Sequence, residues 1–138
     1  MNDDLAEPGA RWQPPLTFRS APYWHSGGDG TLRIARCGDC GRYQHPPAPV
    51  CPACRGSRMA FESVSGTGRI FSYTINRYPW QAQMLVPYVI AEVELIEQEG
   101  LLLISNIITD EPEAVQIDQE VHVEFEQAGD AWIPVFRA

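Results

Sequence analysis

The sequence predicts a mostly β protein in which a short N-terminal helix and a small metal-held ribbon precede a five-stranded barrel. Four cysteines stand in two Cys-x-x-Cys pairs, and five runs of alternating, β-branched and aromatic residues follow them. With 138 residues, 44% of them hydrophobic, the chain has the size of one globular domain or two very small ones. We expect the tail and helix in residues 1–30, the ribbon in residues 31–60 and the barrel in residues 61–138.

The N-terminal stretch is expected to be a tail followed by a short helix. Residues 1–16 contain three prolines and no hydrophobic periodicity, so they either lie along a surface or are disordered. Trp12 and Leu16 either dock against a partner protein or pack on the surface of the chain itself. Ser20 is the expected N-cap of the helix, Pro22 falls in its first turn and a Gly-Gly pair ends it. Tyr23 and Trp24 are expected to pack against the ribbon, and contact with a partner protein is the alternative.

The cysteines predict a structural zinc site. Its four ligands would be Cys37, Cys40, Cys51 and Cys54. Four thiolates complete the tetrahedral shell that Zn²⁺ prefers, and they leave no open position for water or substrate. The alternatives are two disulfides or four buried thiols, but Cys-x-x-Cys disulfides are usually redox-active rather than structural. We therefore expect a structural metal and not a catalytic one.

The residues around the cysteines predict the hairpin of a zinc ribbon. Alternating residues at 31–36 and 42–45 flank the first Cys-x-x-Cys turn, or knuckle. Gly41 directly follows the first pair, where a positive φ turns backbone N–H groups toward sulfur. In the second pair Arg55 takes that place and Gly56 comes one residue later. The second knuckle is therefore expected to be the less regular one.

Five strands and one helix are expected after the ribbon. The strands are residues 68–76, 88–95, 101–107, 121–126 and 132–136. The third is expected to be a more buried strand, and a turn at 97–100 joins it to the second. Residues 110–117 begin with an N-cap aspartate and acidic residues, which predicts a short helix. Five strands with a helix at this point are typical of an oligonucleotide/oligosaccharide-binding (OB) fold barrel.

The loop between the first two barrel strands, residues 77–87, is long for a hairpin connection and lies where OB-folds bind ligands. It carries four large apolar side chains, Tyr78, Trp80, Met84 and Leu85. Such side chains either fold back onto the barrel or enter a partner protein, and the sequence leaves both readings open. Together with Trp24 they are the candidate partner-binding residues.

Charge is distributed unevenly along the chain. The net charge is −8, but residues 1–77 hold nine arginines and six acidic residues, a net charge of +3, and there is no lysine. Residues 78–138 hold one arginine and twelve acidic residues, a net charge of −11. The acidic half would repel phosphates, so nucleic-acid binding is not expected.

No catalytic residues are expected. The three histidines fall in different elements and are interpreted as surface or capping groups, and the glutamates from Glu92 to Glu99 as a solvated face. No apolar run approaches the roughly 18 residues of a membrane span. With no secretory signal and with reduced thiols, the expected location is the cytoplasm.

The order of these features resembles that of the small zinc-ribbon plus OB-fold proteins associated with thiolases. The resemblance covers roughly residues 16–138. It rests on the aromatic helix, a rubredoxin-like four-cysteine ribbon and the sequences Ser65-Gly-Thr-Gly68, Pro87-Tyr88 and Pro134-Val-Phe136. The chain departs from the family pattern at Ile117-Asp118-Gln119, where Ile-Gly is common, and at Glu99-Gly100-Leu101, where a Gly-Pro-Arg-like turn is common.

This resemblance implies a non-catalytic accessory subunit of a heteromeric thiolase-superfamily enzyme that acts on acyl-CoA. The enzyme would be an aldolase, such as one that cleaves steroid side chains, or an acyltransferase. The thiolase-like partner would supply the nucleophile or base, and this chain would support the active site and the CoA channel. A CoA thioester at a shared site would be held through its phosphates by ribbon arginines, and the candidates are Arg36, Arg42, Arg55 and Arg58.

A second functional hypothesis is a single-stranded nucleic-acid-binding protein. OB barrels stack bases on exposed aromatic side chains, and Phe71 and Tyr73 on the first barrel strand are the candidates. The acidic charge of the barrel half argues against this hypothesis.

Overall fold

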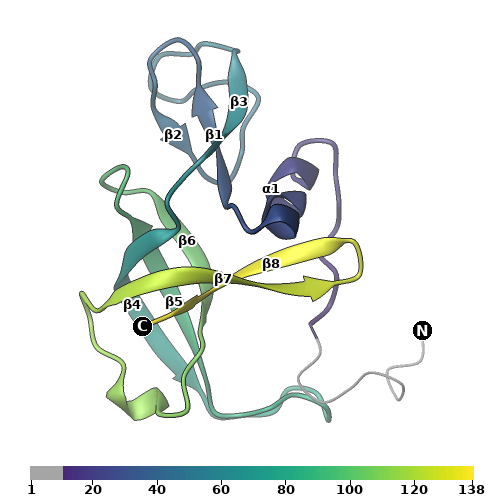
Figure 1. Ribbon diagram of the computed structural model, residues 1–138, viewed down its shortest axis with the longest axis vertical. Coiled ribbons are helices and arrows are strands. Elements are labelled where there is room, and N and C mark those ends of the chain that lie inside the picture. The colour runs from purple at the N-terminus through teal and green to yellow at the C-terminus, as the bar shows by residue number, and fades with distance from the viewer. Residues whose placement is uncertain (1–10) are drawn as a thin grey trace.

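The computed structural model describes residues 11–138, so the predicted tail lies outside the described residues over its first ten positions. A short helix α1 (Ala21–Ser26) and a 3₁₀ turn η2 (Gly27–Asp29) come first (Figure 1). The ribbon contains β1 (Arg33–Cys37), β2 (Tyr43–Gln44) and β3 (Met59–Ser63). The barrel contains β4 (Thr67–Asn76), β5 (Tyr88–Leu95), β6 (Leu102–Ile107), β7 (Glu120–Ala128) and β8 (Ala131–Arg137), with a 3₁₀ turn η3 (Pro112–Ala114) before β7. The predicted fold class is confirmed.

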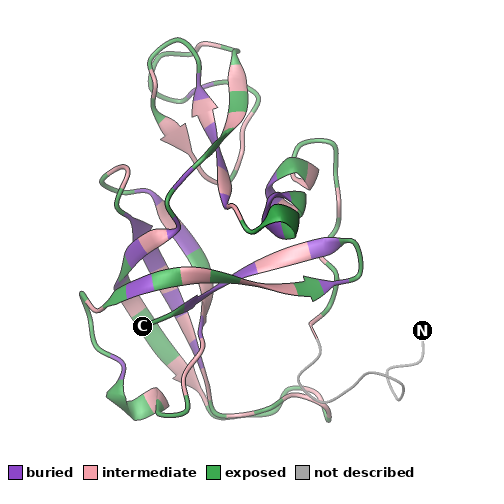
Figure 2. Ribbon diagram, viewed as in Figure 1, coloured by how far each residue is buried: buried purple, intermediate pink, exposed green. Residues whose placement is uncertain are grey.

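The barrel closes in the strand order β4-β5-β6-β8-β7, with β7 returning to β4. Its neighbours are antiparallel except β6 and β8, which run parallel and pair at Ile107 and Phe136. Buried and exposed positions alternate along the strands because successive side chains point to opposite faces (Figure 2). The inward positions form one core, in which the most completely buried side chains include Ile70, Val89, Val93, Leu103, Val121 and Phe136.

The ribbon is a three-stranded antiparallel sheet with β1 in the centre and β2 and β3 at its edges. Strand β3 was not expected from the sequence, because only Met59 and Phe61 among its five residues are large and apolar. Its pairing with β1 runs from Arg33 opposite Ser63 to Cys37 opposite Met59. It therefore crosses residues 60 and 61, where the sequence-based division between ribbon and barrel falls.

The turn between β5 and β6 joins the ribbon to the barrel. The side-chain amide of Gln98 accepts a hydrogen bond from the backbone N–H of Tyr43 (2.8 Å) and donates one to its carbonyl oxygen (3.0 Å). It thus pairs with β2 as a neighbouring strand would. Next to it, the carboxylate of Glu97 accepts a hydrogen bond from the backbone N–H of Ser65 (2.8 Å), which lies between the two units. These bonds fix the orientation of the ribbon on the barrel.

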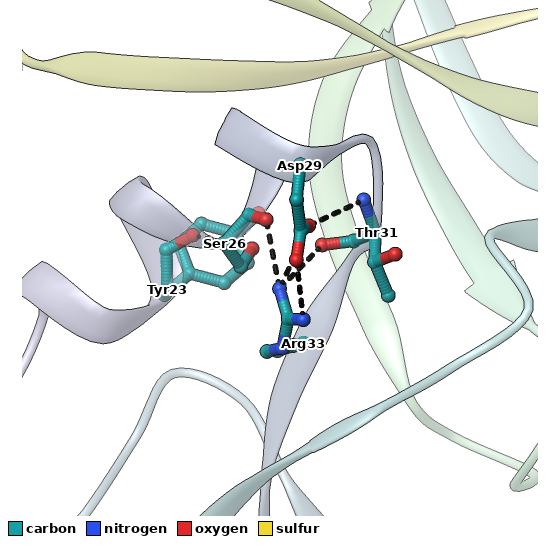
Figure 3. A network of polar contacts seen from close by, with 5 residues as sticks. All are labelled: Tyr23, Ser26, Asp29, Thr31 and Arg33. Atoms are coloured by element: carbon teal, nitrogen blue, oxygen red, sulfur yellow. Dashed lines mark hydrogen bonds and ion pairs between the residues drawn. The ribbon is translucent and has the colours of Figure 1, made fainter.

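Helix α1 lies between the ribbon and the β7–β8 hairpin and contacts both (Figure 1). A salt bridge holds the following turn η2 to β1. The Arg33 guanidinium donates to both carboxylate oxygens of Asp29 (3.0 and 2.7 Å) and to the carbonyl of Ser26 (2.9 Å), and Asp29 also accepts from the N–H of Thr31 (Figure 3). The hydrogen bond from Arg33 lowers the pKa of Asp29 to about 2. The pair is therefore fully charged at neutral pH.

Two local expectations about helices are corrected. The helix begins after Ser20, but the Ser20 side chain makes no cap bond to it and instead binds Thr17. Residues 110–117 form only the single 3₁₀ turn η3, in which the predicted cap Asp110 has no part: Thr109 Oγ1 accepts from the N–H of Glu111 (3.0 Å). The chain becomes extended at Val115, whose buried side chain joins the barrel core. Burial of that side chain outweighs further helix formation.

Two expectations about burial are also wrong. Strand β6 is not buried throughout, because alternation leaves Ile104 76% exposed. The glutamates of β5 and its turn are not all solvated. The Glu94 side chain is only 10% exposed and lies 2.7 Å from the Arg69 guanidinium and 2.9 Å from the N–H of Gly100. The hydrogen bonds from Gly100 and Arg69 lower its pKa, so it is a buried carboxylate that organises the β5–β6 turn.

His45 also differs from the expectation of a surface imidazole. Its ring lies 4.6 Å from that of the buried Tyr23, and burial lowers its pKa to about 4. His45 is therefore neutral at physiological pH and part of the contact between α1 and the ribbon. His25 and His122 are exposed, as expected.

We predict that Gly27→Ala destabilises the contact between η2 and the barrel. A Cβ at Gly27 would lie 2.1 Å from the Phe125 ring, so the ring must shift, and we expect the free energy of unfolding to fall by about 1–3 kcal/mol. Gly28→Ala is the matched control, because its nearest contact is Trp132 Nε1 at 3.2 Å. Denaturant unfolding measures both, and equal effects would contradict the predicted packing of Gly27.

Candidate functional site

The two knuckles bring the four cysteine sulfurs into one cluster. All four Sγ atoms lie within 4.8 Å of one another. The Cys37–Cys54 and Cys40–Cys51 Sγ atoms are each 3.6 Å apart. A tetrahedron with Zn–S distances of about 2.3 Å has S–S edges of about 3.8 Å. The cluster therefore fits a Zn²⁺ ion at its centre with no rearrangement of the backbone.

Both knuckles use the same backbone hydrogen bonds. The carbonyl of the first cysteine accepts from the N–H four residues later, from Gly41 in the first knuckle (2.9 Å) and Arg55 in the second (2.8 Å). The N–H of the first cysteine donates to the carbonyl five residues later in each case. Gly41 has φ of +79° and Arg55 has φ of +66°. The second knuckle is therefore as regular as the first, contrary to expectation, because Arg55 adopts the left-handed conformation that glycine would favour.

Backbone donors favour the thiolate form of two of the four sulfurs, whereas contact with the other thiols raises the pKa of Cys54 to about 12. The N–H groups of Cys54 and Ala53 lower the pKa of the Cys51 thiol to about 7, and those of Cys40 and Asp39 lower the pKa of Cys37. Cys37 and Cys51 are also the two buried ligands, whereas Cys40 and Cys54 are exposed. The thiolate is the form that binds Zn²⁺, so the peptide backbone favours the metal-bound state.

The structure does not bring the four ribbon arginines together as free cations. Arg36 donates to Glu62 (3.0 Å) and to the Gly41 carbonyl (2.7 Å) and lies 4.7 Å from the centre of the Tyr43 ring. Arg58 binds Asp39 (2.8 Å).

The other two, Arg42 and Arg55, are exposed and form no salt bridge within residues 11–138. Binding of CoA phosphates by the four arginines stays a prediction, and Arg42 and Arg55 are the two that are available to bind a phosphate.

The apolar side chains of the loop between β4 and β5 point outward. Tyr78, Trp80 and Leu85 are 61%, 71% and 63% exposed. The rings of Tyr78 and Trp80 pack edge to face with centroids 4.7 Å apart, and Trp80 Nε1 donates to Asn76 Oδ1 (3.3 Å). These contacts hold the two aromatic rings in place while leaving them open to a partner.

The remaining candidates line two hollows on the barrel surface. Met84 and Leu85 line the larger one, of about 670 Å³, and Trp24 lines the smaller one, of about 300 Å³. Residues Tyr88, Asn106 and Ile133 line both. The exposed Ile104 in the smaller hollow was missed, because no local signal distinguishes it from the buried residues of β6.

Comparison with known proteins identifies both units. Residues 24–62 match the family model described as the ChsH2 rubredoxin-like zinc ribbon domain, and residues 62–126 match the ChsH2 C-terminal OB-fold domain. A DUF35 domain-containing scaffold protein of Methanothermobacter thermautotrophicus is 35% identical over 68% of this chain and 71% of that protein. The chain belongs to the DUF35 family. The resemblance inferred from the sequence is confirmed. The four clustered cysteines lie within the part of the chain that matches the zinc ribbon model, which supports a structural zinc site.

Two further relatives are longer proteins. A probable enoyl-CoA hydratase alpha subunit of Thermomonospora curvata is 31% identical over 92% of this chain. The 3-oxo-4,17-pregnadiene-20-carboxyl-CoA hydratase alpha subunit of Mycobacterium tuberculosis is 31% identical over 96% of it. The chain spans 40% and 42% of the length of these two relatives.

Solved structures agree with the family assignment. A chain of the Ltp2-ChsH2(DUF35) aldolase is 31% identical, with a TM-score of 0.81 over 91% of this chain and 98% of that one. A DUF35 protein of unknown function from Sulfolobus solfataricus shares the fold, with a TM-score of 0.60 and 16% identity over 89% of this chain and 87% of that one. Within residues 11–138 no helix combines the length and apolarity of a bilayer span.

We predict that the ribbon depends on its metal. The purified chain should contain one zinc per molecule, and Cys51→Ser should abolish stoichiometric zinc and lower the melting temperature, because three thiolates leave the shell incomplete. Elemental analysis and thermal unfolding measure this. Treatment with a chelator removes the metal, and the same chelator already saturated with zinc serves as the control. An unchanged melting curve after zinc removal would refute the structural role.

We also predict that Arg55→Gly stabilises the second knuckle. Glycine removes the strain of the left-handed conformation at residue 55 but increases the conformational entropy of the unfolded chain. The net effect should be a rise of about 0.5–1 kcal/mol in the free energy of unfolding. Arg55→Ala removes the same charge but keeps a Cβ, so it should give no such gain. A comparable gain in both variants would show that charge, not backbone conformation, limits stability there.

Proposed function

We propose that this DUF35 chain is the non-catalytic accessory subunit of a heteromeric thiolase-superfamily enzyme that acts on acyl-CoA in the cytoplasm. The partner is a thiolase-like aldolase, such as one that cleaves a steroid side chain by a retro-aldol reaction, or an acyltransferase. The partner supplies the reacting groups, and the chain supports its active site and the CoA channel.

The observation that carries this proposal is the outward-facing apolar loop between β4 and β5. Tyr78, Trp80 and Leu85 would be costly to leave in water, and interfaces are enriched in tyrosine and tryptophan because these side chains bury a large area with few rotatable bonds. The zinc shell is complete with four thiolates, so the metal serves to shape the ribbon. The chain thus offers a rigid body with an apolar contact surface.

The names of the relatives support the choice of enzyme class. One matching chain is from the Ltp2-ChsH2(DUF35) aldolase, and two relatives are named as alpha subunits of CoA-thioester hydratases. These names support an accessory role in an enzyme of acyl-CoA chemistry. This extends to the present chain as part of the proposal.

Single-stranded nucleic-acid binding is the weaker hypothesis. Phe71 and Tyr73 are exposed on β4, as stacking would need. Stacking alone does not hold a strand, however, and residues 78–138 with a net charge of −11 lack the positive groove that follows a phosphate backbone.

We predict that Trp80→Ala weakens assembly with the thiolase-like subunit by at least about tenfold, as for a central aromatic anchor. The melting temperature of the chain alone should change little, because the Trp80 side chain is largely exposed. The dissociation constant of the co-purified complex is the measurement. Ile96→Ala is the control, since Ile96 is 66% exposed but lies on the β5–β6 turn.

The proposal fails if the thiolase-like subunit is fully active and soluble without this chain, or if this chain alone turns over a thioester. Calorimetry of the isolated chain with CoA tests whether the ribbon arginines bind CoA. Heat that disappears in an Arg42→Ala/Arg55→Ala double variant would support CoA binding by the ribbon, and the absence of heat would leave only a shared site with the partner.

A further inference from the structure

We propose that the segment of residues 11–20 is a second anchor of the partner interface, with Phe18 and Trp12 as the side chains that enter the thiolase-like subunit. This inference rests on the proposed function and extends it to Phe18, which the sequence analysis did not consider for partner binding.

The first observation is the exposure of Phe18. Its side chain is 98% exposed, the most of any large apolar residue described. The turn that carries it is closely tied: the N–H of Ser20 donates to Thr17 Oγ1 (3.0 Å), the N–H of Thr17 donates to Ser20 Oγ (3.1 Å) and the N–H of Ala21 donates to the Thr17 carbonyl (2.8 Å). A hydrogen-bonded turn thus holds an aromatic ring in water, and no contact within residues 11–138 accounts for the ring.

The second observation is that the whole segment is attached to the barrel. The Arg11 guanidinium donates to Glu126 Oε2 (2.6 Å) on β7 and to Asn106 Oδ1 (2.7 Å) on β6. The Gln13 side chain accepts from the backbone N–H of Asp130 (2.9 Å) in the β7–β8 turn. With α1 packed on the barrel at its other end, the segment is fixed on both sides of Phe18. Little conformational entropy would then be lost when a partner binds the ring.

The third observation is continuity with the loop between β4 and β5. Trp12 is 55% exposed and lines the same hollow, of about 670 Å³, as Met84 and Leu85. Figure 1 shows the segment and the β7–β8 turn on the same side of the molecule. A protein that covers the loop therefore also reaches Trp12, and the segment leads from there to Phe18.

The charges of this segment and of the whole chain favour a protein, rather than a membrane or a nucleic acid, as the binding partner of the segment. Arg11 is neutralised by Glu126, which leaves Arg19 as the only cation of the segment without a salt bridge among the described residues. Anionic lipid surfaces and nucleic acids attract clusters of basic residues, and the chain has a net charge of −8. A folded partner with an apolar pocket and an acidic residue near its rim matches Phe18 and Arg19.

The test compares the affinity of the full chain and its variants for the thiolase-like subunit. Phe18→Ala should weaken binding by about tenfold, the change typical of a hot-spot aromatic. Phe18→Leu should retain most of the affinity, because it keeps an apolar side chain. Neither variant should change the melting temperature of the chain, since the ring is 98% exposed. A photo-crosslinking amino acid at position 18 should attach to the partner subunit in the assembled complex.

Each outcome is decisive. Binding by Phe18→Ala within twofold of the unmodified chain, while Trp80→Ala binds weakly, would overturn this inference and leave the proposed function intact. No complex with the unmodified chain would overturn both. Binding to phosphatidylcholine–phosphatidylglycerol vesicles that Phe18→Ala abolishes would identify a membrane surface as the occupant instead and would also overturn the inference.

Discussion

The convergence of four sulfurs is the constraint on which the ribbon depends. Its sheet has strands of five, two and five residues, too small to bury a core of its own. The metal site closes a loop between two turns that share one set of backbone hydrogen bonds. Because this closure fixes β1, it also fixes Arg33 and Tyr43, through which the ribbon holds α1 and the β5–β6 turn.

The contacts between the ribbon, α1 and the barrel make them one body. Gln98 pairs with β2, Glu97 with the connection between the units, and Arg33 with the end of α1. These are hydrogen bonds made by side chains to backbone groups, and such bonds depend on orientation. Surfaces contributed by the N-terminal segment and by the loop between β4 and β5 are therefore presented in a fixed relation, which is what a subunit that shapes another protein requires.

Several polar groups of this chain stabilise its fold. Asp29, Asp39, Glu62 and Glu94 each bind an arginine, and burial keeps His45 neutral. Eleven large aromatic and aliphatic side chains among the described residues are instead exposed to water. These exposed apolar side chains are what the proposed accessory role in a larger enzyme would use.

The sequence by itself determined what depends on local spacing: the four metal ligands, the five barrel strands and the position of α1 follow from residue order and side-chain period. Only the tertiary structure decided what depends on residues distant in sequence. Strand β3 forms because β1 lies beside it, Glu94 is buried because Arg69 and Gly100 meet it, and residues 110–117 stop at one turn because Val115 enters the core. Arg55 takes a glycine's conformation because the second knuckle must present its sulfurs to the first, and no local preference outweighs that closure.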